Sequence, residues 1–117
     1  MKKAYHLSTC STCQRILKEL KDSNFQLQDI KTEAITEQQI EEMYEHTSSY
    51  ESLFSKRAMK YKSMGLKEKN LKEADFKNLI LEEYTFLKRP VFIVANEIFV
   101  GNSKKTIEAL KNALANE

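Results

Sequence analysis

The feature that most constrains this chain is a pair of cysteines near the N-terminus, Cys10 and Cys13. They are the only two cysteines in its 117 residues. The preceding segment, residues 3–7, alternates in the manner of a short strand. The following segment, residues 11–21, carries apolar residues at helical spacing, and Thr9 or Ser11 is expected to cap it. The sequence therefore predicts two cysteines at the junction of a strand and a helix.

The spacing of the two cysteines favours redox chemistry. A cysteine in the first turn of a helix lies near unsatisfied N–H groups and the positive end of the helix dipole. Both lower its pKa from about 8.5 into the range of roughly 3.5–7.5. We expect Cys10 to take this place as the thiolate nucleophile. Cys13 lies about one turn further on, less exposed, where it can resolve an adduct by forming an intramolecular disulfide.

Two other interpretations of the pair remain open. A structural zinc site needs four ligands, and only His6 and His46 remain as further soft ligands. We therefore expect no metal. Inert packing cysteines are the second alternative, although the polar neighbours Ser11 and Thr12 are not typical of a core.

The rest of the chain predicts an α/β fold in the order β-α-β, a block of helices, then β-β-α. The almost continuous apolar run 91–94 is typical of a strand buried on both faces. We expect a single domain over residues 1–117, with one mixed sheet and a helical insertion at approximately 36–86. The expected strands are 3–7, 25–29, 91–94 and 98–100, and the expected helices are 11–21, 36–45, 51–61, 70–84 and 104–114.

Composition narrows the class of protein. The net charge is +2, from 19 basic and 17 acidic residues, which is too balanced to indicate direct nucleic-acid binding. No apolar run has the length of a signal peptide or a membrane span. We expect a cytoplasmic monomer that binds no membrane. In a reducing cytosol, two cysteines indicate a catalytic, sensing or metal role more than a permanent disulfide.

Four motifs give the chain a resemblance to the arsenate reductase (ArsC) and Spx family, which has a thioredoxin-like, or glutaredoxin-like, fold with a helical insertion. They are the Cys-x-x-Cys after the first strand, the Ser55-Lys56-Arg57 stretch, the Arg89-Pro90 pair before the third strand, and the hairpin exit at Val100-Gly101. The resemblance covers nearly the whole chain.

The resemblance implies site residues beyond the cysteines. Pro90 is expected to follow a cis peptide bond, and Arg89 to face Cys10, stabilise its thiolate and hold an oxyanion. Arg57, His6, Thr12 and Pro90 are expected to line the substrate site. His6 matches a histidine that similar arsenate reductases carry before the catalytic loop, although a satisfied strand histidine is the alternative.

Departures from the family pattern refine the expected function. Arsenate reductases of this family clamp the oxyanion with three arginines and usually lack the second cysteine. Here Ser55 stands near the place of the first arginine, and Gly101-Asn102 supplies none. Oxyanion affinity should therefore be poor, and a thiol–disulfide oxidoreductase fits better than an arsenate reductase.

The expected partners follow from that function. The electron donor would be glutathione, thioredoxin or glutaredoxin, with no bound cofactor, and the substrate a glutathione mixed disulfide or a protein disulfide. The alternative from a different class is an Spx-like transcriptional regulator, whose disulfide gates binding to the RNA polymerase α subunit.

Overall fold

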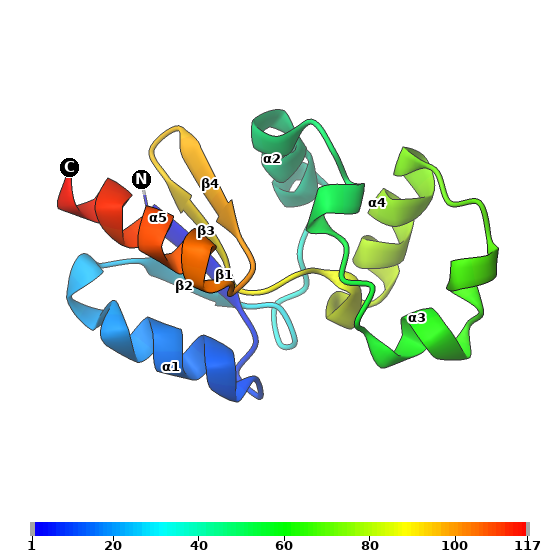
Figure 1. Ribbon diagram of the computed structural model, residues 1–117, viewed down its shortest axis with the longest axis horizontal. Coiled ribbons are helices and arrows are strands. Elements are labelled where there is room, and N and C mark those ends of the chain that lie inside the picture. Colours follow the sequence, from blue (N-terminus) through cyan, green and yellow to red (C-terminus); the bar gives the residue numbers. More distant parts are fainter. Residues whose placement is uncertain (1, 117) are drawn as a thin grey trace. The chain divides into compact units, whose positions relative to one another are not determined.

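The computed structural model describes residues 2–116, and within them the chain forms two compact units. The first unit is discontinuous and combines residues up to Glu33 with those from Arg89 onward, while the second runs from Ala34 to Lys88. Figure 1 shows the sheet in the first unit and only helices and turns in the second. That the two units form one domain stays a prediction.

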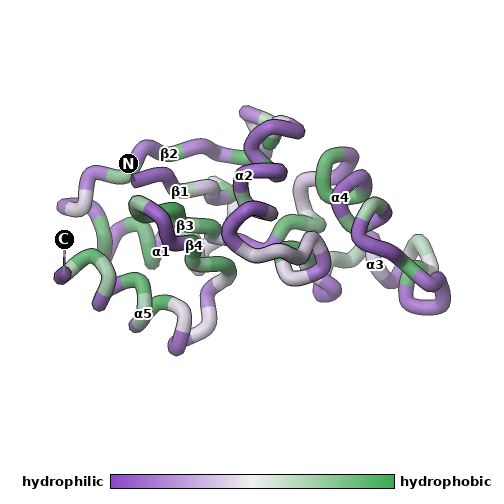
Figure 2. Tube along the Cα trace, turned by 90° about the horizontal axis from the view of Figure 1, so that it is seen from above, coloured by the Kyte–Doolittle hydropathy of each residue, from purple (hydrophilic) through white to green (hydrophobic). Residues whose placement is uncertain are grey.

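The first unit is built on a four-stranded mixed sheet in the order β2-β1-β3-β4. Strand β1 (Lys2–His6) pairs in parallel with β2 (Gln26–Asp29) and antiparallel with β3 (Val91–Val94). Strand β4 (Glu97–Val100) completes a hairpin with β3. All four residues of β3 are buried, and Figure 2 shows its hydrophobic character. The predicted α/β, thioredoxin-like fold is confirmed.

Two helices cover the core of this sheet, α1 (Ser11–Glu19) and α5 (Lys104–Ala115), and the short 3-10 helix η1 (Lys21–Ser23) follows α1. Burial of apolar surface between these helices and the sheet is the main stabilising contribution to the unit. The buried cluster that joins them consists of Ala4, Ile16, Leu20, Phe92, Val94, Phe99 and Leu110.

The second unit packs around Phe54. Its ring stacks on Phe86 at a centroid distance of 4.9 Å and meets Phe76 edge-on at 5.0 Å. None of the helices in residues 2–116 has the length and apolar character needed to cross a membrane. The elements of this unit are α2 (Glu37–Thr47), η2 (Glu51–Leu53), α3 (Met59–Ser63), η3 (Leu66–Glu68), α4 (Glu73–Glu82) and η4 (Tyr84–Phe86).

The prediction of one helix over 51–61 is wrong. Only η2 and α3 are helical there, and Phe54 forms an extended bridge with Leu87. The N–H of Ser55 donates to the carbonyl of Phe86, and the N–H of Lys88 donates to the carbonyl of Leu53. These long-range bonds take backbone groups that a continuous helix would use internally.

In strand β2, the residue that is buried is polar and the apolar residue beside it is exposed. Leu27 is 53% exposed, whereas Gln28 is only 1% exposed. The side-chain amide of Gln28 donates to the carbonyl of Glu33 at 3.1 Å, which satisfies this buried polar group. Leu27 therefore lies on the exposed face of β2, whereas Phe25, just before the strand, packs on Phe92.

Candidate active site

Cys10 lies at the junction of β1 and α1 and is itself the N-cap of the helix. Its backbone is extended, with φ −93° and ψ 110°, and its Sγ accepts a hydrogen bond from the N–H of Cys13 at 3.5 Å. The prediction that Thr9 or Ser11 caps this helix is wrong. The sulfur takes the position of the usual hydroxyl or carboxylate cap, so the first helical N–H groups point toward the thiol.

The surroundings of Cys10 favour its thiolate. Partial burial by itself raises the pKa of Cys10, but four other contributions act in the opposite direction. They are hydrogen bonds from the N–H and the thiol of Cys13, the positive charge of Arg89 and the N–H of Thr12. Together they bring the pKa of Cys10 below its ordinary value.

Cys13 has the opposite character. It is 0% exposed, and burial raises its pKa to about 12. The N–H of Leu7 and the charge of Arg89 favour its thiolate, whereas its interactions with Cys10 oppose it. No disulfide joins the two cysteines in this structure. Cys10 is half-buried, and Cys13 is buried. The site therefore combines an accessible thiol of lowered pKa, Cys10, with a buried thiol of raised pKa, Cys13.

The loop that carries Cys10 is held by Gln14, a residue that the sequence analysis missed. The carbonyl of Leu7 accepts hydrogen bonds from the N–H of Cys10 at 2.9 Å and from the Gln14 side-chain amide at 3.1 Å. The same amide lies 3.3 Å from Nδ1 of His6. His6 is thus buried beside the loop and reaches it through Gln14. No sequence signal distinguishes Gln14 from an ordinary helical surface residue.

Asp29, at the end of β2, fixes the other side of the loop and was also missed. Its Oδ1 accepts hydrogen bonds from the N–H groups of Ser8 at 3.3 Å and Lys31 at 3.2 Å. Hydrogen bonding from Ser8 is the largest reason that the pKa of Asp29 lies below its usual value. Asp29 stands opposite His6 in the parallel register of β1 and β2, which only the strand pairing could have revealed.

The Arg89-Pro90 pair enters this site from the start of β3. The peptide bond between them is cis, which confirms the prediction from the resemblance. Pro90 is buried and Arg89 half-buried. The charge of Arg89 acts on both cysteines, so Cys10, Cys13 and Arg89 are brought together as the sequence analysis predicted. Their catalytic roles stay predictions.

The remaining predicted residues lie in different surroundings. Thr12 is half-buried in the first turn of α1 and contributes its N–H to Cys10. Arg57 belongs to the second unit, where it lies exposed in the turn before α3 instead of in a helix. Substrate binding by Thr12, Arg57, His6 and Pro90 stays a prediction. Across residues 2–116, no group of three or more His, Cys, Asp or Glu side chains is arranged to hold a metal ion.

A mixed sheet with a Cys-x-x-Cys at the start of its first helix and a cis-proline beside it defines a thioredoxin-like protein with a dithiol site. The ArsC family model matches residues 5–110, and the chain belongs to the ArsC family. No curated protein matches it significantly in sequence.

Solved structures of several bacterial proteins are similar to this fold. A possible arsenate reductase from Streptococcus mutans is 26% identical, with a TM-score of 0.76 over 95% of this chain and 98% of that one. An arsenate reductase from Vibrio cholerae is 16% identical, with a TM-score of 0.73 over 94% and 95%. An arsenate reductase (ArsC) related protein from Brucella melitensis is 20% identical, with a TM-score of 0.71 over 92% of each chain.

Proposed function

We propose that this protein is a thiol-dependent reductase that exchanges dithiol for disulfide at Cys10 and Cys13. The observation that carries the proposal is the opposite character of the two thiols. The pKa of half-buried Cys10 is lowered, whereas that of buried Cys13 is raised to about 12. The nucleophile in thiol exchange is the thiolate, so attack is assigned to Cys10 and resolution to Cys13.

The proposed cycle has two exchange steps. The Cys10 thiolate attacks a substrate disulfide, forms a mixed disulfide and releases the first substrate thiolate. Cys13 then gives up its proton and attacks the Cys10 sulfur, which forms the Cys10–Cys13 disulfide and releases the second thiolate. The substrate gains two electrons and the protein loses two. An external thiol donor, glutathione or a redoxin, returns the pair to the dithiol.

Arg89 supports this cycle electrostatically. Its charge favours the thiolate of Cys10 in the resting state and that of Cys13 when the latter must lose its proton. Of the solved proteins with this fold, one is named as an arsenate reductase and another as a possible arsenate reductase, which supports a thiol-dependent reductase. Disulfides are the proposed substrates here because Gly101-Asn102 supplies no arginine to an oxyanion clamp.

The test is a thiolate titration of Cys10 in the Cys13→Ser variant, followed by trapping with a glutathione mixed disulfide. We expect a pKa below about 8.5, a stable mixed disulfide in the variant, and an intramolecular disulfide in the natural protein. The Cys10→Ser variant should form neither. An ordinary pKa together with no mixed disulfide would exclude the proposal. Arsenate, assayed with the same donor, should turn over more slowly than the disulfide.

A further inference from the structure

Positive charge in this protein is concentrated in one stretch of the second unit. Residues 56–72 contain seven of the 19 lysines and arginines but only one of the 17 aspartates and glutamates. The other 100 residues therefore carry 12 basic and 16 acidic residues, an excess of negative charge. Figure 2 shows α3, within this stretch, as hydrophilic. A near-neutral chain thus has a strongly basic segment.

Most of this charge is not neutralised within the protein. Lys56 pairs with Glu51, and Lys60 pairs with Glu83 at 2.6 Å. The other five cations have no ion-pair partner among the residues that the structure describes. All five are exposed, and they are Arg57, Lys62, Lys67, Lys69 and Lys72. Repulsion among them has a cost in the isolated protein, which an acidic partner would relieve.

The same stretch exposes apolar side chains. Met59 is 88% exposed and Met64 is 46% exposed. Methionine adapts its flexible thioether to different partners and is frequent on binding surfaces. A basic segment that served only solubility would not need two exposed methionines, so the surface favours a partner with apolar groups as well as negative charge.

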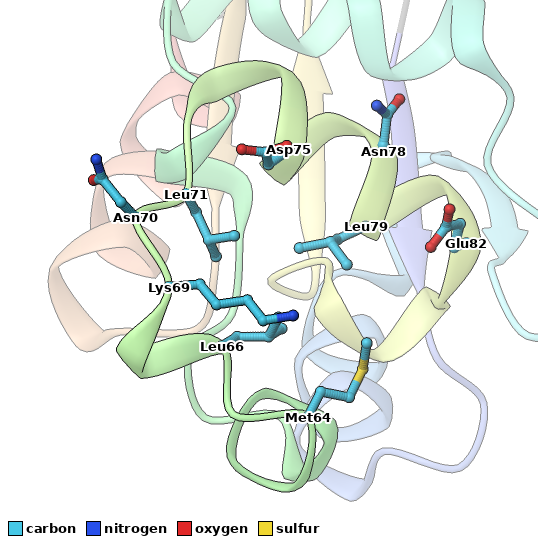
Figure 3. Close-up of a pocket in the computed structure, with 9 residues that line it drawn as sticks. All are labelled: Met64, Leu66, Lys69, Asn70, Leu71, Asp75, Asn78, Leu79 and Glu82. Carbon is cyan, nitrogen blue, oxygen red and sulfur yellow. The ribbon is translucent and has the colours of Figure 1, made fainter.

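A cavity of about 430 Å³ adjoins this segment, between η3 and α4 (Figure 3). Its apolar lining comes from Met64, Leu66, Leu71 and Leu79, and Lys69 points into it (Figure 3). This volume lies in the usual range for ligand pockets, roughly 300–1,000 Å³. The cavity can therefore receive a large aliphatic side chain and pair a neighbouring carboxylate with Lys69.

The cavity also distinguishes between kinds of acidic partner. Asp75 and Glu82 line it, and Asp75 accepts a hydrogen bond from the N–H of Lys72 at 2.9 Å. These carboxylates would repel any anionic group that enters the cavity, so the negative charges of a partner must lie outside it, over the lysines. The lining has no aromatic side chain on which a base could stack. A polypeptide suits this surface better than a nucleic acid, because it can place carboxylates over the lysines and an apolar side chain in the cavity.

We propose that residues 56–72 and the adjoining cavity bind an acidic segment of another protein, with one aliphatic side chain of that segment inserted between η3 and α4. The proposal does not rest on the redox function. The Cys10→Ser variant should bind as well as the natural protein, so failure of either proposal leaves the other intact.

The test uses a fluorescein-labelled peptide in which acidic residues flank a single leucine, with binding to the full chain followed by fluorescence anisotropy. Reversal of three charges, Lys62→Glu with Lys67→Glu and Lys69→Glu, should weaken binding roughly tenfold or more. A matched reversal in the first unit, Lys21→Glu with Lys104→Glu and Lys105→Glu, should change it by less than about threefold, because those charges lie outside the site.

Three further measurements decide the proposal. Leucine-to-serine replacement in the peptide should weaken binding, and amide chemical shifts on binding should fall within residues 56–82. A Lys→Gln version of the triple variant gives the same answer if the Glu version does not fold. The proposal is wrong if the peptide does not bind saturably, if both triple variants weaken it equally, or if a single-stranded oligonucleotide or an anionic vesicle binds more tightly than the peptide.

Discussion

At the scale of single residues, Arg89 links the two cysteines electrostatically, since its charge acts on both. Arg89→Gln should raise the pKa of Cys10 toward its ordinary value. The alkylation rate of Cys10 at neutral pH should then fall severalfold, because less thiolate is present. The measurement is the pH dependence of alkylation in the Cys13→Ser background.

Arg15→Gln is the matched control for that change. Arg15 is exposed on α1, where it pairs with Glu19, and it is not among the groups that shift the pKa of Cys10. An identical pH profile for the Arg89 and Arg15 variants would mean that Arg89 does not tune the nucleophile.

Cys13 should make the protein lose stability in alkali. Its folded pKa is raised to about 12, so the folded state holds a proton that the unfolded chain releases above about pH 8.5. This contribution to stability is complete below that pH and is lost progressively as pH rises toward the folded value. Cys10 acts in the opposite direction: its pKa is lowered in the folded state, so its contribution to stability increases as pH rises through about 8.5 and adds no further slope once the unfolded thiol is ionised.

Urea denaturation under reducing conditions measures the effect. Between about pH 8 and pH 10, which brackets the ordinary thiol pKa, the free energy of unfolding should fall more steeply for the natural protein than for Cys13→Ser. Cys10→Ser should keep the steep slope. Parallel curves for all three proteins would contradict the assigned protonation state of Cys13.

At the scale of elements, local motifs were predictable and long-range pairings were not. The Thr-x-x-Gln spacing of Thr36 and Gln39, at the start of the helix expected over 36–45, is typical of a capping box, and both reciprocal hydrogen bonds are present at 3.1 Å. Residues 51–61 do not form the single helix that was predicted, because their backbone makes hydrogen bonds with Phe86 and Lys88, more than thirty positions further along the chain. A periodic apolar pattern carries no information about such partners.

The capping box gives a prediction for α2. Thr36→Ala removes the acceptor of the Gln39 N–H and should lower the free energy of unfolding by about 1 kcal/mol. Thr36→Ser keeps a hydroxyl acceptor and should cost clearly less. Chemical denaturation of the three proteins provides the comparison. An equal loss in both variants would attribute the effect to the threonine methyl group and not to the cap.

At the scale of the molecule, the sequence could predict those residues of the candidate site that belong to local sequence motifs. Cys10 and Cys13 at a strand-to-helix junction, and Arg89-Pro90 before β3, could be read from motifs. Gln14 and Asp29 could not, because their roles depend on the folding of α1 and β2 back onto one loop. A side chain that supports the loop leaves no motif of its own.

The chain order of the two units has a thermodynamic consequence for the whole molecule. The first unit is interrupted by the 55 residues from Ala34 to Lys88. If the second unit unfolds, the first must hold together the ends of a flexible loop of that length, at an entropic cost of about 3–4 kcal/mol. That cost is a large part of the stability of a small domain. Loss of structure in the second unit should therefore destabilise the first.

Single tryptophan reporters can follow each unit, since the natural chain has none. Phe25→Trp reports on the first unit beside Phe92, and Tyr61→Trp on the second beside Phe54. Ile80→Ala, at a fully buried position of α4, should lower the urea midpoint of both reporters together. Glu45→Ala, at an exposed position of α2, should leave the urea midpoints of both reporters unchanged. If Ile80→Ala shifts only the Tyr61→Trp signal, the units unfold independently and the single-domain prediction is wrong.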